Sequence, residues 1–267
     1  MNLHITRLAK ILLVVVMGNF VAACDEEDSE KPNTPDTGAI PKIASLSWIN
    51  NISGDSGWKK FTYDAKGRIA KEERRNIILS WDKSSELVYE FETVYKYTDA
   101  EIVATRTELG DTEFISSITT YQLNNKGLVK DEYIQEYMFA GSEPSEKTNV
   151  RSYVYDENGY LKQVQRYGSF ARITEYVVSD QNIHRIKDPH IEYYYDKTNT
   201  LGLNNYGISF FGKDSKNLYK RGGPPEWHDF EYHEYEFDAK GRPVKDIQTY
   251  QEAGQLNMST YTYVYTN

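Results

Sequence analysis

Hydrophobic and polar positions alternate at period two in short stretches along much of the chain, and the clearest stretches flank a polar turn that ends in glycine. The phrase FTYDAKGRIAK, at Phe61–Lys71, contains one such turn, and three further copies of it end at Lys130, Lys162 and Lys245. Alternation on both sides of a turn is typical of a β-hairpin with one buried face. The pattern therefore predicts four hairpins of the same design.

The residue types within the turn predict its geometry. Asp64 can accept hydrogen bonds from backbone amides and start a type I turn, and Gly67 can take the left-handed conformation that closes a three-residue loop with a bulge. The same types recur at the same offsets in Asn124 and Gly127, Asp156 and Gly159, and Asp238 and Gly241. An aliphatic residue expected on the buried face follows each glycine: Ile69, Val129, Leu161 and Val244. We therefore interpret the repeated phrase as structural.

Weaker copies of the pattern fill the intervals, and residues 260–266 predict a closing strand. Together they predict an all-β fold, a long antiparallel meander of about fifteen strands in serial hairpins. A meander with one apolar face must curl, close or be covered, so we expect a curled or barrel-like body. Helical periodicity is nearly absent. A short helical insertion is expected near 204–222, within the segment Asn199–Trp227 that interrupts the hairpins.

The N-terminus predicts an export signal. Residues 1–23 combine two basic residues, an apolar run at Ile11–Met17 and small residues, which are the parts of a signal peptide. The sequence VAAC, ending at Cys24, resembles the lipobox of bacterial lipoproteins, which implies cleavage before Cys24 and lipidation of its thiol. The alternative is an ordinary secretory signal beside an unrelated cysteine. The remaining chain divides into a lipidated, flexible stalk at 24–41 and a single β-hairpin domain at 42–267.

Charge narrows the classes of partner. The full chain carries a formal net charge of −9, and removal of Arg7 and Lys10 with the signal would make it −11. This acidity argues against nucleic acid and against direct adsorption to anionic lipid. The stalk begins with DEED directly after Cys24, which resembles the signal that sends Bacteroidetes lipoproteins to the cell surface. A merely solvated spacer is the alternative. We expect a lipid-anchored outer-membrane protein, with the cell surface favoured over the inner leaflet.

Two resemblances concern the hairpins. The Tyr-Asp-x-x-Gly phrase is distantly similar to the YD repeat of RHS-type proteins, although four clear copies are few for such a shell. The whole chain resembles a Bacteroidetes lipoprotein family of unknown function with a porin-like β fold, which combines a lipobox, an acidic stalk, serial hairpins and a late FF…SKNL segment. Phe210-Phe211 and Ser215–Leu218 match that segment. The resemblance implies a curled antiparallel body that is not a membrane-spanning pore, and it carries no catalytic residues.

Motifs of catalysis and metal binding are missing from the sequence. No nucleophile elbow, P-loop, dinucleotide fingerprint or paired-cysteine motif is present. His228 and His233 are five residues apart, so a strand would place them on opposite faces, and we interpret them as polar strand residues. Forty acidic residues make any carboxylate pair uninformative as a glycosidase signature. The sequence thus predicts a non-enzyme without cofactor, catalytic site or metal.

The interruption of the hairpins holds the candidate binding residues. Trp227 ends it, and Tyr206 and Tyr219 lie near it in sequence, so these three aromatic side chains could stack on a sugar or anchor a protein. A core or sheet-edge role is the alternative for each. Three functions follow: non-catalytic binding of a glycan or protein partner, a structural or assembly component of an envelope complex, and a carbohydrate-active enzyme.

Overall fold

Sixteen antiparallel strands follow one another along the described part of the computed structural model, which comprises residues 40–80, 82–110, 114–186, 190–222, 231–252 and 255–266. The first eight are β1 (Ile43–Asn50), β2 (Ser56–Tyr63), β3 (Ile69–Leu79), β4 (Glu86–Tyr97), β5 (Glu101–Leu109), β6 (Phe114–Leu123), β7 (Val129–Glu136) and β8 (Thr148–Tyr155). The others are β9 (Leu161–Arg166), β10 (Arg172–Ser179), β11 (Asn182–Arg185), β12 (Glu192–Thr198), β13 (Asn217–Gly222), β14 (Glu231–Phe237), β15 (Pro243–Glu252) and β16 (Gln255–Tyr265).

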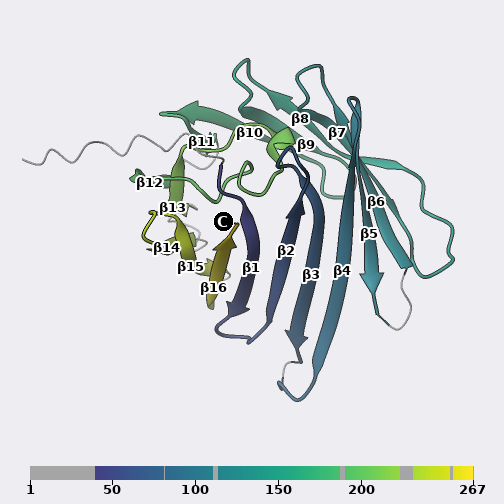
Figure 1. The fold of residues 1–267 in the computed structure, drawn as a ribbon, viewed down its shortest axis with the longest axis horizontal. Coiled ribbons are helices and arrows are strands. Elements are labelled where there is room, and N and C mark those ends of the chain that lie inside the picture. Colours follow the sequence, from purple (N-terminus) through teal and green to yellow (C-terminus); the bar gives the residue numbers. More distant parts are fainter. Residues whose placement is uncertain are drawn as a thin grey trace, which may run out of the picture. The chain divides into compact units, whose positions relative to one another are not determined.

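One sheet contains all sixteen strands, and chain neighbours are sheet neighbours except at a single point. The first strand, β1, pairs with the last, β16, so that β11 and β12 become the two edges. The sheet curls until these edges approach each other, which makes a nearly closed barrel (Figure 1). The predicted all-β antiparallel meander is confirmed, with one strand more than the approximate count. No helix among the described residues is long and apolar enough to cross a membrane.

The four glycine turns have a common hydrogen-bond pattern. In the first, the amide of Gly67 donates to the carbonyl of Asp64 (2.9 Å), and the Asp64 carboxylate accepts from the amides of Lys66 and Arg68 (both 2.9 Å). The bond from the glycine amide to the carbonyl three residues earlier recurs at Asn124–Gly127, Asp156–Gly159 and Asp238–Gly241. The φ angles of the four glycines lie between 71° and 86°, the left-handed region that glycine adopts without steric cost.

A β-bulge next to several turns rotates an apolar residue toward the inside of the barrel. The register between β2 and β3 shifts beside Tyr63, and Ile69 is 2% exposed. The corresponding shift between β14 and β15 pairs Phe237 with Pro243, which is fully buried. Pro243 therefore fills the inward position that the sequence pattern assigned to Val244, because it stands two residues after Gly241, as Ile69 does after Gly67, whereas Val244 stands three residues after its glycine.

Tyrosine hydroxyls complete the bulges. The hydroxyl of Tyr97 donates to the carbonyl of Ile69 (2.6 Å), which lies at the bulge of the neighbouring strand. Two other tyrosines at strand ends do the same: Tyr63 donates to Ile43 (2.6 Å) and Tyr265 to Pro243 (2.9 Å). A bulge interrupts the ladder and leaves backbone groups without a strand partner, so these hydroxyls supply the missing bond.

The segment between β12 and β13, residues 199–216, lies across the end of the barrel where the glycine turns are, and we name it the cap (Figure 1). The amides of Ile43 and Ile69 donate to the cap carbonyls of Asn205 and Gly207, each at 3.0 Å. Farther along, the amide of Lys213 donates to the carbonyl of Gly159 (2.9 Å). Phe210 of the cap is buried with Ile69, Ile102 and Val129, so the cap and the bulge residues share one hydrophobic core.

The cap is far less helical than the sequence predicts. Its helical part is one 3-10 turn, η1 (Ser209–Phe211), and residues 217–222 form β13 rather than a helix. Gly207 and Gly212 flank η1 with φ angles of 70° and 100°. Because left-handed residues cannot continue a right-handed helix, the turn ends as soon as it has begun.

The seam between the barrel edges closes through both side-chain and backbone hydrogen bonds. Asn182 of β11 accepts a hydrogen bond from the amide of Asn217 (2.9 Å) and donates to its side-chain oxygen (3.1 Å). The amide of Lys216, in the cap, donates to the carbonyl of Gln181 (3.0 Å). Asn182 is completely buried, which fits a polar residue whose bonds are all made inside the protein. The cap thus joins the two edges that strand pairing leaves apart.

Candidate functional site

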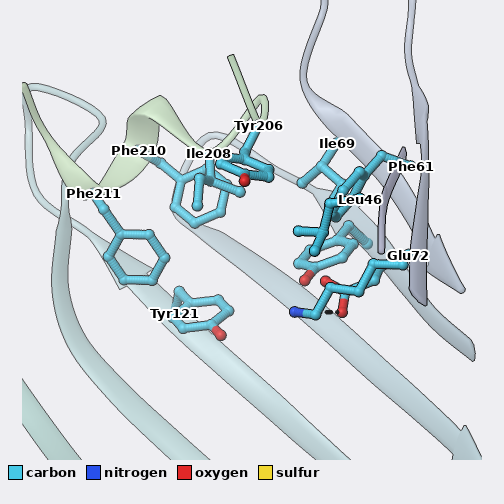
Figure 2. A pocket seen from close by; sticks show the side chains of 11 residues that line it. Leu46, Phe61, Ile69, Glu72, Tyr121, Tyr206, Ile208, Phe210 and Phe211 are labelled. Atoms are coloured by element: carbon cyan, nitrogen blue, oxygen red, sulfur yellow. Dashed lines mark ion pairs between the residues drawn. The ribbon is translucent and has the colours of Figure 1, made fainter. Parts of the chain in front are cut away.

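A cavity of about 300 Å³ lies beneath the cap, between it and the inner face of the sheet (Figure 2). The walls come from the strands and from the cap. Leu46, Lys59, Phe61, Ile69, Glu72, Tyr95 and Tyr121 project from the strands, and Tyr206, Ile208, Phe210 and Phe211 project from the cap. Most of this surface is aromatic or aliphatic. Small-molecule sites of proteins commonly have such a concave apolar wall with a few polar groups.

The rings of the cap and of the sheet pack in edge-to-face and tilted pairs. Tyr121 of β6 packs against both Phe210 (5.9 Å between centroids) and Phe211 (5.4 Å). Tyr206 contacts Phe61 of β2 with its ring nearly perpendicular, at 5.4 Å. Figure 2 shows Phe210 and Phe211 pointing from the cap toward Tyr121. These contacts fix the aromatic wall, because edge-to-face pairs are favourable beyond the area they bury.

Three tyrosine hydroxyls in this wall have no hydrogen-bond partner among the described residues. They belong to Tyr95, Tyr121 and Tyr206. Tyr63 and Tyr97 pack against the same hydrophobic core, but each of their hydroxyls donates to a carbonyl at a bulge. Buried tyrosine hydroxyls normally find a partner. The contrast separates tyrosines that hold the fold from tyrosines that offer an unused donor and acceptor to the cavity.

These phenols stay protonated at physiological pH. Burial raises the pKa of Tyr95, and nearby charge on Glu72 raises it further. Burial likewise raises the pKa of Tyr121 and of Tyr206 well above the ordinary range. Each hydroxyl therefore presents one hydrogen-bond donor and its acceptor lone pairs to the cavity. Such groups suit a neutral, hydroxyl-rich ligand.

One ion pair adds charge to the apolar wall. The Nζ of Lys59 lies 3.0 Å from Oε1 of Glu72, and both side chains are largely shielded from solvent (Figure 2). The pair joins neighbouring strands β2 and β3 on the inner face. It leaves further donor and acceptor capacity on both groups, since an ammonium has three N–H bonds and a carboxylate has several lone pairs.

A second cavity, of about 350 Å³, lies on the other side of Tyr206. Tyr206 lines both cavities, and Tyr219 lines the second. The remaining walls include Tyr193, Asn199, Leu201, Asp214, Ser215, Asn217, Leu218, His233, Tyr235, Asp246 and Tyr263. This cavity is thus more polar than the first, and the two sequence-predicted tyrosines within the described residues meet in it.

His233 is the charged centre of the second cavity. Its Nδ1 lies 3.0 Å from Oδ2 of Asp246, and its Nε2 lies 3.4 Å from Oε1 of Glu231. Burial alone would lower the pKa of the imidazole, but the two carboxylates outweigh it and raise that pKa to about 9. His233 is therefore a cation at neutral pH. No group of three or more His, Cys, Asp or Glu side chains among the described residues has an arrangement that could hold a metal ion.

The structure places two of the residues that the sequence predicts as functional and does not describe the other two. Tyr206 and Tyr219 both line cavities, whereas Trp227 and Cys24 lie outside the described residues. The ring of Tyr219 meets His233 edge to face at 5.0 Å, and its carbonyl accepts from the hydroxyl of Tyr235. Sequence reasoning did not single out Tyr95 and Tyr121 as binding residues. Tyr121 was visible only as part of a hairpin arm, because alternation identifies a face and not an unpaired hydroxyl.

Comparison with solved structures finds the same fold in a crystal structure of a porin-like protein from Bacteroides uniformis. The match has a TM-score of 0.56 and covers 84% of this chain and 98% of that chain, with 14% sequence identity. The two proteins share a fold. No protein-family model matches the chain, and neither does any curated protein. The porin-like fold expected from the resemblance is therefore confirmed, while kinship with YD repeats stays a prediction.

Proposed function

We propose that this protein is a lipid-anchored outer-membrane protein, favoured at the cell surface, that binds a glycan beneath the cap without catalysing a reaction. The observation that carries the proposal is the set of hydroxyls on Tyr95, Tyr121 and Tyr206, in one aromatic wall, that have no hydrogen-bond partner within the described part of the chain. A sugar ring has an apolar face of C–H groups that packs on aromatic rings. Its hydroxyls can exchange hydrogen bonds with phenols, which both donate and accept.

The volume of the cavity and its walls on two sides favour a small ligand over a large protein surface. Ligand cavities are concave and begin at about 300 Å³, which is the size of the space beneath the cap. The walls are held by strands and by a cap that is bonded to their bulges, so the site is formed before the ligand arrives. Preformed sites lose less entropy on binding.

The location rests on the N-terminal sequence and on the outer face of the barrel. VAAC at Cys24 and the following DEED support a lipid anchor and export. On the face of β3 and β4 that turns away from the cavity, Lys71 lies 3.2 Å from Glu92, and Arg75 lies 3.4 Å from Glu90. Charged cross-strand pairs suit a face in contact with water, whereas strands that face lipid carry an apolar band. The lipid, rather than this face of the barrel, would hold the protein at the membrane.

A binding assay with matched tyrosine variants tests the proposal. The purified full chain is screened on an array of bacterial, plant and host glycans, and hits are measured by calorimetry. Tyr95→Phe and Tyr121→Phe remove only the hydroxyl, so each should weaken binding about tenfold, the effect of one lost hydrogen bond in a shielded site. Tyr97→Phe is the control, because its hydroxyl bonds Ile69. A blank array, or equal losses in all three variants, would reject the site.

A structural or assembly role is the second candidate, and the loops opposite the cap favour it. Met138 and Phe139, between β7 and β8, are 88% and 64% exposed, and Phe170, between β9 and β10, is 88% exposed. Large apolar side chains with such exposure often contact another protein. Chemical cross-linking in intact cells, followed by detergent extraction, would recover a stable envelope partner under this role. Substitution of the three residues by serine should then abolish the cross-link.

Hydrolysis of a glycan is the third candidate, since Asp214 and Asp246 both line the second cavity. Burial raises the pKa of Asp214, as in a general acid, although the amides of Leu203 and Ser215 partly oppose the rise. Both carboxylates are already engaged: Asp214 accepts from Leu203 (2.6 Å), and Asp246 holds His233 and Gln248. Binding is therefore the better-supported function. New reducing ends after incubation with bound oligosaccharides, lost in Asp214→Asn, would favour hydrolysis instead.

A further inference from the structure

Two arginines continue the inner face of the barrel beyond the cavity, toward the end opposite the cap. Arg74 follows Glu72 by two residues on β3, so both side chains lie on one face, roughly 7 Å apart along the strand. Arg106 follows the buried Ile102 and Ala104 at the same spacing on β5. Because Glu72 lines the cavity and Ile102 belongs to the core, both arginines lie on the inner face.

Each guanidinium rests on an aromatic ring of the same face. The Cζ of Arg106 lies 3.7 Å from the ring centroid of Phe91, and that of Arg74 lies 5.8 Å from the ring of Trp48. Trp48 and Phe91 share their strand faces with Leu46 and Tyr95, which line the cavity. A guanidinium attracted to the face of a ring keeps its N–H edges available to other acceptors.

Neither guanidinium has a carboxylate partner within ion-pairing distance among the described residues. Most other cations of the sheet do: Lys59 pairs with Glu72, Arg151 with Glu132 and Arg75 with Glu90. Within the described ranges, Arg74 donates only to the side chain of Asn76 (2.9 Å). Arginine is always charged in proteins, so the inner face here holds two positive charges that lack a matching salt bridge.

The two charges affect each other. Burial lowers the pKa of Arg106, and the charge of Arg74 lowers it further, while Glu108 and Glu72 act in the opposite direction. Glu72 is already neutralised by Lys59. In a chain with a net charge of −9, a half-buried pair of like-charged arginines is stabilised by an anion that reaches it.

We propose that Arg74 and Arg106 form an anion subsite that binds the carboxylate or sulfate group of an acidic oligosaccharide held in the cavity. This inference rests on the proposed glycan binding and narrows it to acidic glycans. The flat guanidinium matches both groups with two parallel N–H···O bonds. The aromatic wall receives one sugar ring near the cap, and the arginines bind the charged group of another ring farther along the same oligosaccharide.

Oligosaccharides of matched length and different charge test the subsite. The purified full chain in detergent is titrated with oligogalacturonates, sulfated heparin-derived oligosaccharides and neutral malto-oligosaccharides. At least one acidic series should bind ten times more tightly than the neutral series, with an affinity that falls as salt rises. The comparison of the two acidic series decides between carboxylate and sulfate.

Variants of three arginines show which side chains cause the preference for acidic oligosaccharides. Arg74→Gln and Arg106→Gln should each weaken acidic binding about tenfold and leave neutral binding unchanged. Arg75→Gln is the matched control, because it is adjacent in the chain, faces away from the cavity and pairs with Glu90. Thermal unfolding of each variant verifies that it folds.

The outcomes separate this inference from the proposed function. If neutral and acidic oligosaccharides bind equally well, or if Arg75→Gln weakens acidic binding as much as the inner-face variants, the anion subsite is wrong and glycan binding stands. If no oligosaccharide of any charge binds, both proposals fall together. If acidic binding is lost only in the inner-face variants, both are supported.

Discussion

The amide of Ile69 donates a hydrogen bond to the carbonyl of Gly207 at 3.0 Å, which ties the bulge of the first glycine hairpin to the cap. The bulge frees that amide from the strand ladder, and the cap uses it. Ile43 and Asn205 repeat the arrangement one hairpin earlier, also at 3.0 Å. The repeated phrase therefore builds the strands and also the docking points for the segment that interrupts the repeat.

Gly207→Ala should detach the cap from this docking point. A Cβ at position 207 would lie 2.7 Å from the amide nitrogen of Ile69 and 2.8 Å from the ring of Tyr63, at a φ of 70°. We expect a loss of about 2–4 kcal/mol in the free energy of unfolding, from strain and overpacking together. Gly127→Ala has a similar φ of 73° and open space around the new Cβ, so it should lose only about 1–2 kcal/mol. Equal losses in urea denaturation would contradict the docking argument.

Tyr97→Phe should destabilise the barrel, whereas Tyr95→Phe should not. The first change leaves the carbonyl of Ile69 without its hydroxyl donor and should cost about 1–2 kcal/mol. The second removes a hydroxyl that has no partner among the described residues, so the free energy of unfolding should stay within about 0.5 kcal/mol of its original value. Both rings remain in place. Chemical denaturation of the two variants, side by side, checks the assignment.

His233 should make stability depend on pH above neutrality. Its pKa of about 9 in the folded protein is higher than its ordinary value of 6.5, so the folded state holds the proton more tightly. The contribution is complete below pH 6.5 and is lost as the pH rises to 9, with a total on the order of 2–3 kcal/mol.

Urea denaturation between pH 6 and 9.5 measures this dependence. His233→Gln cannot be protonated, so it should be less stable at pH 6 and show a flatter profile between pH 6.5 and 9. If the stability of His233→Gln fell between pH 6.5 and 9 as steeply as that of the original chain, His233 would not be the group that loses its proton there.

Asn182→Ala should open the seam between β11 and β13. The substitution removes the acceptor of the Asn217 amide (2.9 Å) and the donor to its side chain (3.1 Å), in a fully buried position. Groups left unsatisfied there should cost about 1–3 kcal/mol. Amides of β11 should exchange faster in hydrogen–deuterium exchange. Asn158→Ala, at an exposed turn position, should change neither quantity, and slow exchange in both variants would argue against the seam.

Cys24→Ser should abolish membrane attachment. Without a thiol the chain cannot be lipidated, so it should move from the detergent phase to the aqueous phase on phase separation, or remain unprocessed. Ser29→Ala, in the stalk, is the control and should partition as the original chain does. A serine variant that stays in the detergent phase would contradict the anchor, and protease treatment of whole cells then decides the leaflet.

Much of the barrel could be predicted from local chemistry. Asp64 and Gly67 determine a tight turn within four residues, and alternation on either side determines which face is buried. Turn residues and alternation involve positions that are close together in the chain, so they can be recognised in a single sequence. The error at Val244 is one of position: the inward residue stands two places after each turn glycine, as Ile69 does after Gly67, and after Gly241 that place holds Pro243.

The cap and the cavity could not be predicted in the same way. Gly207 is left-handed and interrupts the helix predicted near 204–222, and its partner Ile69 is far away in the chain. Whether a tyrosine hydroxyl is used, as in Tyr97, or left over, as in Tyr95, depends on contacts across strands and across the cap. Hydrophobic periodicity contains no such information.

The adjacency of β1 and β16 places both ends of the barrel chain together. The amide of Thr266 donates to the carbonyl of Lys42 at 2.8 Å, and the carbonyl of Pro41 accepts from the cap residue Asn205 at 2.8 Å. A short linker could join these ends, and new termini could be cut into a tight turn such as Lys126–Gly127 without separating any strand from its neighbours. The order in which the hairpins are synthesised could thus be rotated around the ring, which makes this barrel a natural subject for circular permutation.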